Sequence, residues 1–183
     1  MGHALPAADR VIELLGLEPL PHEGGSFRET YRSTKTIAAP ALPFASERDR
    51  HCSTQIYYML RAGETSALHR VRSDEVFHHY IGDPVTQLLV DEASAETVMI
   101  GRDLERGHRP QRVVPAGVWQ GACIDPAHAD AGYALLGCTV SPGFDWEDFE
   151  LITREAADAL REAFPQHDAL ISRLTPVPGR TRA

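Results

Sequence analysis

The chain has 183 residues, which is the length of a single domain able to bury a sizeable core. Its 26 acidic and 18 basic residues leave a formal net charge of −8, and this balance repels an extended phosphate backbone, so we expect no nucleic-acid partner. No segment approaches the ~18 apolar residues of a membrane span, and the N-terminus lacks a secretory pattern. We therefore expect a cytoplasmic protein without a membrane partner.

The first elements follow from hydrophobic spacing. Apolar residues recur at the helical period over residues 6–15, and Gly16 follows where a helix commonly ends, so we expect a short amphipathic helix. From residue 27 the pattern changes to short alternating or apolar runs between Gly, Pro and Asp, which is typical of a sandwich or barrel. These runs predict strands over residues 27–33, 53–60, 66–71, 75–80, 85–90, 96–100, 111–114, 117–123 and 132–140.

Three further segments are less regular or helical. Residues 34–50 hold prolines and a charged run without periodicity, which predicts an exposed loop that could act as a lid. Helical spacing returns after Thr153, a residue type that caps helices, and Pro165 ends this helix before a short one that runs to residue 174. The tail, residues 176–183, is rich in Pro, Gly and Arg, and we expect it to fray.

Two motifs contain the polar residues best suited to chemistry. Side chains alternate along a strand, so His69 and Glu75, on neighbouring predicted strands, can point into one cavity. Both residues belong to a segment that begins and ends with glycine, residues 63–82. A second segment, Pro115-Ala-Gly-Val-Trp-Gln120, ends in an amide side chain. Four arginines beside the motifs could hold a small anion despite the net negative charge: Arg28, Arg32, Arg70 and Arg72.

These motifs resemble those of a known superfamily. The spacing of Gly63, His69, Glu75 and Gly82 is similar to the first motif of the cupin superfamily, and residues 115–120 are similar to its second motif, with glutamine in the histidine position. The finer resemblance is to the cupin-5 family, formerly the domain of unknown function 985. It is carried by Glu23-Gly-Gly-Ser-Phe-Arg-Glu-Thr-Tyr-Arg-Ser33, Ser73-Asp-Glu-Val-Phe-His78, Gly82-Asp-Pro84, Val114-Pro-Ala-Gly-Val-Trp-Gln-Gly121 and Gly137-Cys-Thr-Val-Ser-Pro-Gly-Phe144.

The resemblance implies a mainly β, single-domain cupin jelly roll, that is, an RmlC-like barrel, with a short N-terminal helix and C-terminal helices. We expect one domain over residues 1–183, with a core at about residues 20–152 and a helical segment at 153–174 before the frayed tail. The resemblance also implies a homodimer formed by sheet extension through the N-terminal region. It implies no established reaction, because cupins host many activities.

The metal-binding pattern of the cupins is incomplete in this sequence. A full site needs three imidazoles and a carboxylate, and the chain offers His69 and Glu75 but has Val71 and Gln120 at the other two positions. Valine cannot coordinate, and a neutral amide is a poor ligand for a transition metal. We therefore expect no catalytic metal and no other cofactor. A divalent metal, if one binds, would use His69, Glu75 and His79.

Without a metal, His69 is a candidate general base that Glu75 orients. The alternative is that the two side chains only satisfy one another inside the barrel. Tyr58 is the candidate acid on the opposite side of the substrate, and three other tyrosines, Tyr57, Tyr80 and Tyr133, remain open for that role. The other candidate residues would bind the substrate: Arg28, Glu29, Gln55, His78, His79, Trp119 and Gln120.

Three functions remain open for such a site. The leading hypothesis is a metal-independent isomerase, epimerase or lyase acting on a polar, carbohydrate-like or nucleotide-sugar small molecule. A weaker resemblance of residues 23–29 and 67–69 to the dTDP-sugar 3,5-epimerases, cupins that work without metal, favours it. The alternatives are a non-catalytic cupin that only binds a small-molecule ligand, and a metal-dependent cupin oxygenase or isomerase.

Overall fold

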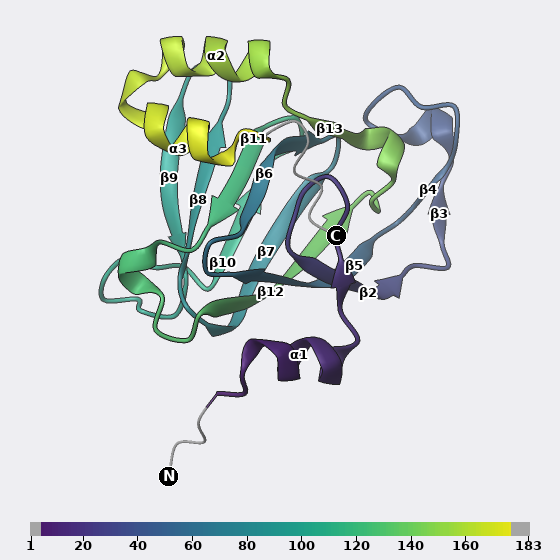
Figure 1. Ribbon diagram of the computed structural model, residues 1–183. Coiled ribbons are helices and arrows are strands. Elements are labelled where there is room, and N and C mark those ends of the chain that lie inside the picture. Colours follow the sequence, from purple (N-terminus) through teal and green to yellow (C-terminus); the bar gives the residue numbers. More distant parts are fainter. Residues whose placement is uncertain (1–4, 177–183) are drawn as a thin grey trace.

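The computed structural model describes residues 5–176 and consists of two β-sheets packed face to face (Figure 1). The larger sheet has six strands in the order β1 (Glu18–Pro19), β2 (Ser26–Arg32), β5 (Thr54–Arg61), β12 (Tyr133–Ser141), β7 (Asp74–Gly82) and β10 (Gln111–Val114). The smaller sheet has five, in the order β13 (Phe149–Leu151), β6 (Thr65–Val71), β11 (Trp119–Cys123), β8 (Val85–Val90) and β9 (Ala95–Ile100). All pairings within both sheets are antiparallel.

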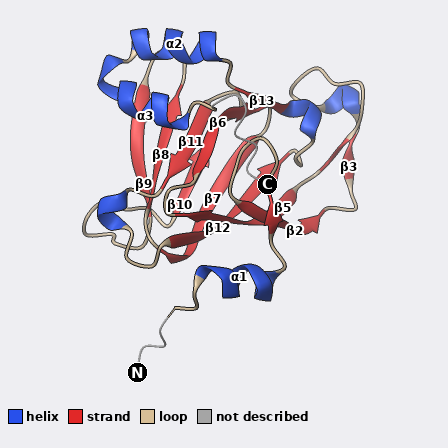
Figure 2. Cartoon of the chain, in the orientation of Figure 1, coloured by secondary structure: helices blue, strands red, loops and turns tan. Residues whose placement is uncertain are grey.

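Helices cover the outer faces of the two sheets, and strands form the centre of the molecule (Figure 2). Helix α1 (Ala8–Leu15) packs on the six-stranded sheet, where Val11 joins Met59 and Leu135 in a buried cluster. Helices α2 (Arg154–Ala163) and α3 (Asp168–Leu174) lie across the five-stranded sheet (Figure 1). Short 3-10 turns complete the elements: η1 (Ala39–Ala41), η2 (Pro126–His128), η3 (Trp146–Asp148) and η4 (Pro165–His167).

The main core lies between the two sheets and consists of inward-facing residues from alternate strand positions. Tyr58, Phe77 and Leu136 come from the six-stranded sheet, and Leu89 and Ala122 face them from the five-stranded sheet. This pattern of two apolar inner faces is the one that alternation predicts for a jelly roll. The mainly β architecture with a short N-terminal helix and C-terminal helices is confirmed.

The helix signals in the sequence are also confirmed in detail. Gly16 follows α1 with φ of 60°, a left-handed conformation that glycine adopts without strain. The Thr153 side chain accepts a hydrogen bond from the backbone N–H of Ala156 and so caps α2. Among residues 5–176, no helix combines the length and the apolar character needed to cross a bilayer.

The description of residues 34–50 as an exposed loop is wrong in part. The segment contains β3 (Thr36–Ile37) and β4 (Arg50–His51), which pair as a small two-stranded ribbon. Its last residue, Arg50, is 3% exposed because its side chain reaches Asp148, far away in the sequence. A local pattern of charges cannot show such a long-range partner. The predicted frayed tail lies, from residue 177 onward, outside the described residues.

Candidate functional site

A cavity of about 210 Å³ opens between the two sheets near the centre of the molecule. Strands β2, β5, β7 and β12 line it from the six-stranded sheet, and β6 and β13 line it from the other sheet. This volume is below the ~300–1,000 Å³ of typical drug-sized ligand sites, so the cavity encloses only a small molecule. Its lining residues are Leu20, Glu23, Phe27, Glu29, Arg32, Thr54, Ile56, His69, Val71, Glu75, Cys138, Val140, Phe144, Asp145, Trp146 and Phe149.

His69 lies at the inner end of this cavity and is 3% exposed. Its Nδ1 is 2.7 Å from the backbone oxygen of Ala67, which can only accept, so the proton of the neutral ring is on Nδ1. The ring stacks on Phe149 with centroids 5.2 Å apart. Nε2 therefore keeps its lone pair, and within residues 5–176 it has no hydrogen-bond partner.

Glu75 shares the cavity with His69, as alternation predicts, but its hydrogen-bond partner is an amide. The Nε2 of Gln120 donates to Oε2 of Glu75 at 2.5 Å, and Gln87 in turn donates to Gln120 at 3.1 Å. Burial raises the pKa of Glu75, and the nearby Glu23 carboxylate adds to the rise, while His69 and Gln120 oppose it. The structure therefore brings His69, Glu75 and Gln120 together, and Glu75 is held by Gln120.

The carboxylate nearest to Nε2 of His69 is Glu23, which the sequence reasoning did not name as a site residue. Its Oε2 lies 3.9 Å from Nε2, and its Oε1 accepts a hydrogen bond of 2.6 Å from Ser66. The two glycines that follow Glu23 were the sequence feature that could have indicated its position. Gly24 has φ of 101°, and a Cβ there would lie 2.4 Å from the Thr65 oxygen, so the glycine lets this turn press against β6.

Tyr58, the candidate acid, is 1% exposed and does not line the cavity. Its hydroxyl donates to the backbone oxygen of Gly24 at 3.0 Å, which pins the turn that contains Glu23. Burial raises the pKa of Tyr58 well above its usual value, and the charge of Glu23 adds to this. Tyr58 therefore contacts the site through the Glu23 turn.

A β-bulge decides which residues of β2 face the cavity. The pairing of β2 with β5 shifts between Glu29 and Tyr31, so that Glu29 and Arg32 both line the cavity. They form an ion pair with two hydrogen bonds of 3.0 and 2.6 Å. Arg28 points to the other face and donates to the Leu15 oxygen at 2.9 Å. Of these two predicted ligand-binding residues, Glu29 lines the cavity and Arg28 does not.

The aromatic wall of the cavity comes from a segment that the sequence reasoning did not select. We call Phe144, Trp146 and Phe149 the aromatic wall; their ring centroids lie 5.1 to 6.3 Å apart. Trp146 remains 47% exposed at the mouth. The predicted wall residue Trp119 instead lies under the guanidinium of Arg70, 4.5 Å from its ring centroid, and packs with the α2 and α3 cluster.

Three other predicted ligand-binding residues lie away from His69. Gln55 is exposed on the outer face of the six-stranded sheet. His78 is half-buried on that face, where it contacts Thr139 at 3.3 Å. His79 faces inward, but its Nε2 donates to the Asp83 oxygen at 2.9 Å, and burial lowers its pKa. It is four residues from Glu75 along β7, which at ~3.3 Å per residue is roughly 13 Å away.

The side chains present do not fit the four-ligand metal site of the cupins. Val71 lines the cavity with a side chain that has no donor atom, and Gln120 directs its N–H at Glu75. His79 is too far along β7 to replace either position. Within the described part of the chain, no group of three or more His, Cys, Asp or Glu residues lies close enough to hold an ion. We derive no step through a metal.

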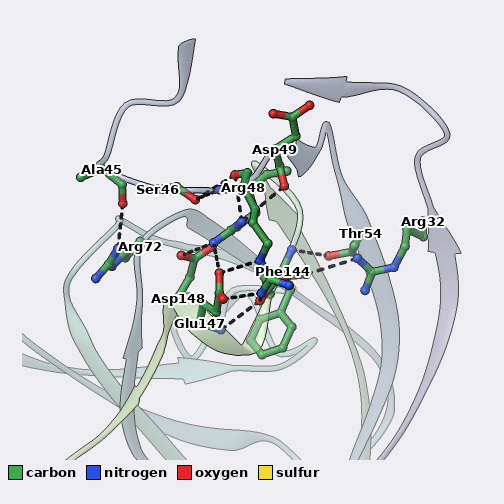
Figure 3. Close-up of polar contacts among 12 residues, drawn as sticks. Arg32, Ala45, Ser46, Arg48, Asp49, Thr54, Arg72, Phe144, Glu147 and Asp148 are labelled. Carbon is green, nitrogen blue, oxygen red and sulfur yellow. Dashed lines mark hydrogen bonds and ion pairs between the residues drawn. The ribbon is translucent and has the colours of Figure 1, made fainter. Parts of the chain in front are cut away.

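Polar contacts link Arg48 and Arg50 to Glu147 and Asp148, which neighbour the aromatic wall in the sequence (Figure 3). Arg50 binds Asp148 through two hydrogen bonds of 2.6 and 3.0 Å, and both residues are buried. Arg48 pairs with Glu147 at 2.5 Å. From the other side, Thr54 accepts a hydrogen bond of 2.9 Å from the N–H of Phe144. The segment predicted as a lid is therefore anchored to one wall of the cavity.

Comparison with known proteins agrees with this fold. A family model described as "Cupin superfamily (DUF985)", Cupin_5, matches residues 9–152. The chain belongs to the Cupin_5 family. The resemblance that the sequence motifs indicated is therefore confirmed, and the two packed sheets are the jelly-roll barrel of this superfamily.

Three similar proteins match this chain over most of their length. A hypothetical protein from Leishmania major is 34% identical, with a TM-score of 0.80 over 94% of this chain and 100% of that one. Protein SO0799 from Shewanella oneidensis is 35% identical, with a TM-score of 0.76 over 94% and 99%. The uncharacterized protein YML079W of Saccharomyces cerevisiae is 28% identical over 73% of this chain and 69% of its own. None of these names states a reaction.

Proposed function

We propose that this Cupin_5 protein binds a small polar molecule in the cavity and transfers a proton next to a carbonyl group, with His69 as the general base. The observation that carries the proposal is the state of the His69 ring. Ala67 holds its Nδ1, and Nε2 lines the cavity with a free lone pair. A base must present such an atom to its substrate. The reaction class is an isomerase, epimerase or lyase that works without a metal.

The carboxyl groups support the two halves of this reaction. When Nε2 takes a proton from carbon, the ring becomes cationic, and Glu23 at 3.9 Å stabilises that charge. The electron pair moves to the carbonyl oxygen, which then needs a proton or a hydrogen bond. Glu75, whose pKa burial raises, can supply it from its neutral form. We therefore favour Glu75 over the buried Tyr58 as the acid.

Deuterium exchange tests the proposal directly. Small molecules retained by the native protein are identified by mass spectrometry, and the purified compound is incubated with protein in D₂O. We expect His69→Gln to lower deuterium incorporation by about 10²–10⁴-fold, the range of general-base catalysis, without loss of folding. His128→Gln, a change of an exposed histidine outside the cavity, is the matched control. Exchange that continues at the native rate in His69→Gln contradicts the assignment.

A non-catalytic binding protein is the second candidate function. The chain of amide contacts from Gln87 through Gln120 to Glu75 favours it, because mutually bonded buried groups form a rigid binding site without further chemistry. Binding of the retained compound with no exchange in D₂O would support this candidate. The metal-dependent alternative predicts near-stoichiometric metal in protein purified without chelator, which elemental analysis measures.

A further inference from the structure

The polar atoms of the cavity suggest the charge of its ligand. Four carboxyl side chains line it, Glu23, Glu29, Glu75 and Asp145, against one arginine and His69. The arginine is Arg32, and both of its bonds to the cavity carboxyls go to Glu29. No cation among the lining residues is therefore left free to receive an anionic ligand.

The buried end of the cavity contains two acceptors that face one another. Oε2 of Glu23 and Nε2 of His69 lie 3.9 Å apart, and Nδ1 of His69 already donates to Ala67. His69 is 3% exposed, and its Nε2 has no hydrogen-bond partner among residues 5–176. Both residues line the cavity, so a ligand that brings hydrogen-bond donors to this end is favoured.

We propose that the cavity takes an ammonium-bearing small molecule, whose cation binds Glu23 beside His69 and whose carbon skeleton packs along the aromatic wall. An ammonium group supplies three donors and no acceptor, which suits an end of the cavity lined by acceptors, and binding through Glu23 leaves Nε2 of His69 free to act as the base. A phosphate or carboxylate would instead add a third acceptor and meet the surrounding carboxylates.

The size of the cavity limits the choice of ligand further. A volume of about 210 Å³ holds a single sugar ring or a short aryl or alkyl amine, and it leaves no room for the nucleotide of a nucleotide sugar. An amino sugar is therefore the carbohydrate-like molecule that suits it best. This inference uses the proposed function only in taking the same cavity as the ligand site.

Two matched sets of probes test the inference by titration calorimetry. One set is benzylamine, benzyl alcohol and benzoate; the other is glucosamine, glucose and glucuronate. We expect the amine of at least one set to bind about tenfold more tightly than its neutral partner, and the acids to bind most weakly. An acid that binds more tightly than its amine, or amine and alcohol that bind equally, would overturn the inference. So would the failure of both amines at roughly 10 mM.

Substitutions test whether the preference for amine probes arises in the cavity. Glu23→Gln should lower the affinity for the amine about tenfold and leave that for the neutral probe unchanged. Glu105→Gln, an exposed change outside the cavity, is the control and should have no effect. If Glu23→Gln fails to fold, Glu23→Asp provides the test, because it withdraws the carboxylate from the bound amine by one methylene and should weaken the amine and not the neutral probe. An amine affinity that Glu23→Gln, or Glu23→Asp in its place, leaves unchanged overturns the inference.

The outcomes separate this inference from the proposed function. An amine that binds but shows no deuterium exchange supports the ligand class and contradicts catalysis. Exchange catalysed on a neutral or anionic compound, with no amine bound, supports catalysis and contradicts the ligand class.

Discussion

Glu75 shows how burial changes the chemistry of one carboxyl group. The residue is 7% exposed, and its Oε2 accepts a hydrogen bond from Gln120. Desolvation disfavours the charged form, so the pKa of Glu75 lies above its ordinary value of 4.5. The folded protein therefore holds this proton more tightly than the unfolded chain does.

This difference predicts a pH-dependent stability. Between pH 4.5 and the raised native pKa, the folded state binds more protons than the unfolded state, so the stabilising effect of neutral Glu75 is lost as pH rises. Glu75→Gln removes the ionisable group, so the variant does not lose this stability as pH rises. We therefore expect the free energy of unfolding of the variant to increase relative to that of the native protein as pH rises through that window. Urea unfolding at several pH values measures it, with Glu105→Gln as control; a constant difference contradicts the prediction.

The glycines at the two ends of the first motif are required for different structural reasons. Gly63 and Gly82 both have positive φ, 88° and 93°. A Cβ at Gly63 would meet nothing within 4 Å, whereas at Gly82 it would lie 2.1 Å from the Tyr133 oxygen. The first glycine is needed for backbone conformation alone, and the second also for the close approach of β12.

We expect alanine substitutions at these two positions to lower the free energy of unfolding by different amounts. Gly63→Ala should cost about 1–2 kcal/mol from the left-handed conformation. Gly82→Ala should cost roughly 1–3 kcal/mol more, because backbone must also move to relieve the clash. Thermal or urea unfolding compares the two variants. Equal losses of unfolding free energy in the two variants would show that β12 does not approach Gly82 closely.

At the scale of elements, the segment 34–50 and the aromatic wall act as one unit. The buried pair of Arg50 and Asp148 joins β4 to η3, and η3 contains Trp146, which lines the cavity. Arg48, by contrast, is 59% exposed where it meets Glu147. The two arginines therefore offer a matched comparison of a buried and an exposed ion pair.

Removing the buried partner should loosen the wall. Arg50→Met leaves Asp148 buried without its cation and should cost about 3–5 kcal/mol of unfolding free energy. Arg48→Met, at the exposed pair, should cost about 0–1 kcal/mol. Denaturant unfolding measures the stability, and fluorescence quenching of Trp146 in a Trp119→Phe background reports exposure of the wall. Similar small losses in both variants would mean that β4 does not hold the wall.

For the whole molecule, the edge of the six-stranded sheet is open along most of β2. The two residues of β1 pair only with Ser26 and Phe27, so β2 from residue 28 to 32 has no strand partner on its outer side among the described residues. An unpaired edge is a template for strand pairing with another chain. The homodimer that the family resemblance implies stays a prediction, and this edge is where we place it.

The mass of the assembly can be measured in solution. Light scattering should give twice the 20.2 kDa of the chain, and Tyr31→Arg, at a half-exposed position of the free edge, should lower the measured mass toward one chain. Leu104→Arg, at an exposed apolar residue elsewhere, is the control. A single-chain mass for the native protein at tens of micromolar, or a dimer unchanged in Tyr31→Arg, contradicts the prediction.

Local sequence patterns were enough to predict most of the regular elements and the shared cavity of His69 and Glu75. Strand alternation and helical period are local properties, and they predicted most strand ranges within about two residues. Alternation also predicted that His69 and Glu75 share one cavity, and the resemblance to the cupin motifs implied that Val71 and Gln120 stand at metal-ligand positions.

The surroundings of these two residues could not be predicted from local patterns. The Glu23 turn, the bulge that turns Arg32 inward and the return of residues 144–149 over the barrel all depend on contacts between distant segments. The same contacts place Trp119 and Gln55 outside the cavity. Periodicity reports the face of a strand that a side chain occupies, but which distant segment packs against that face is settled by folding the whole chain.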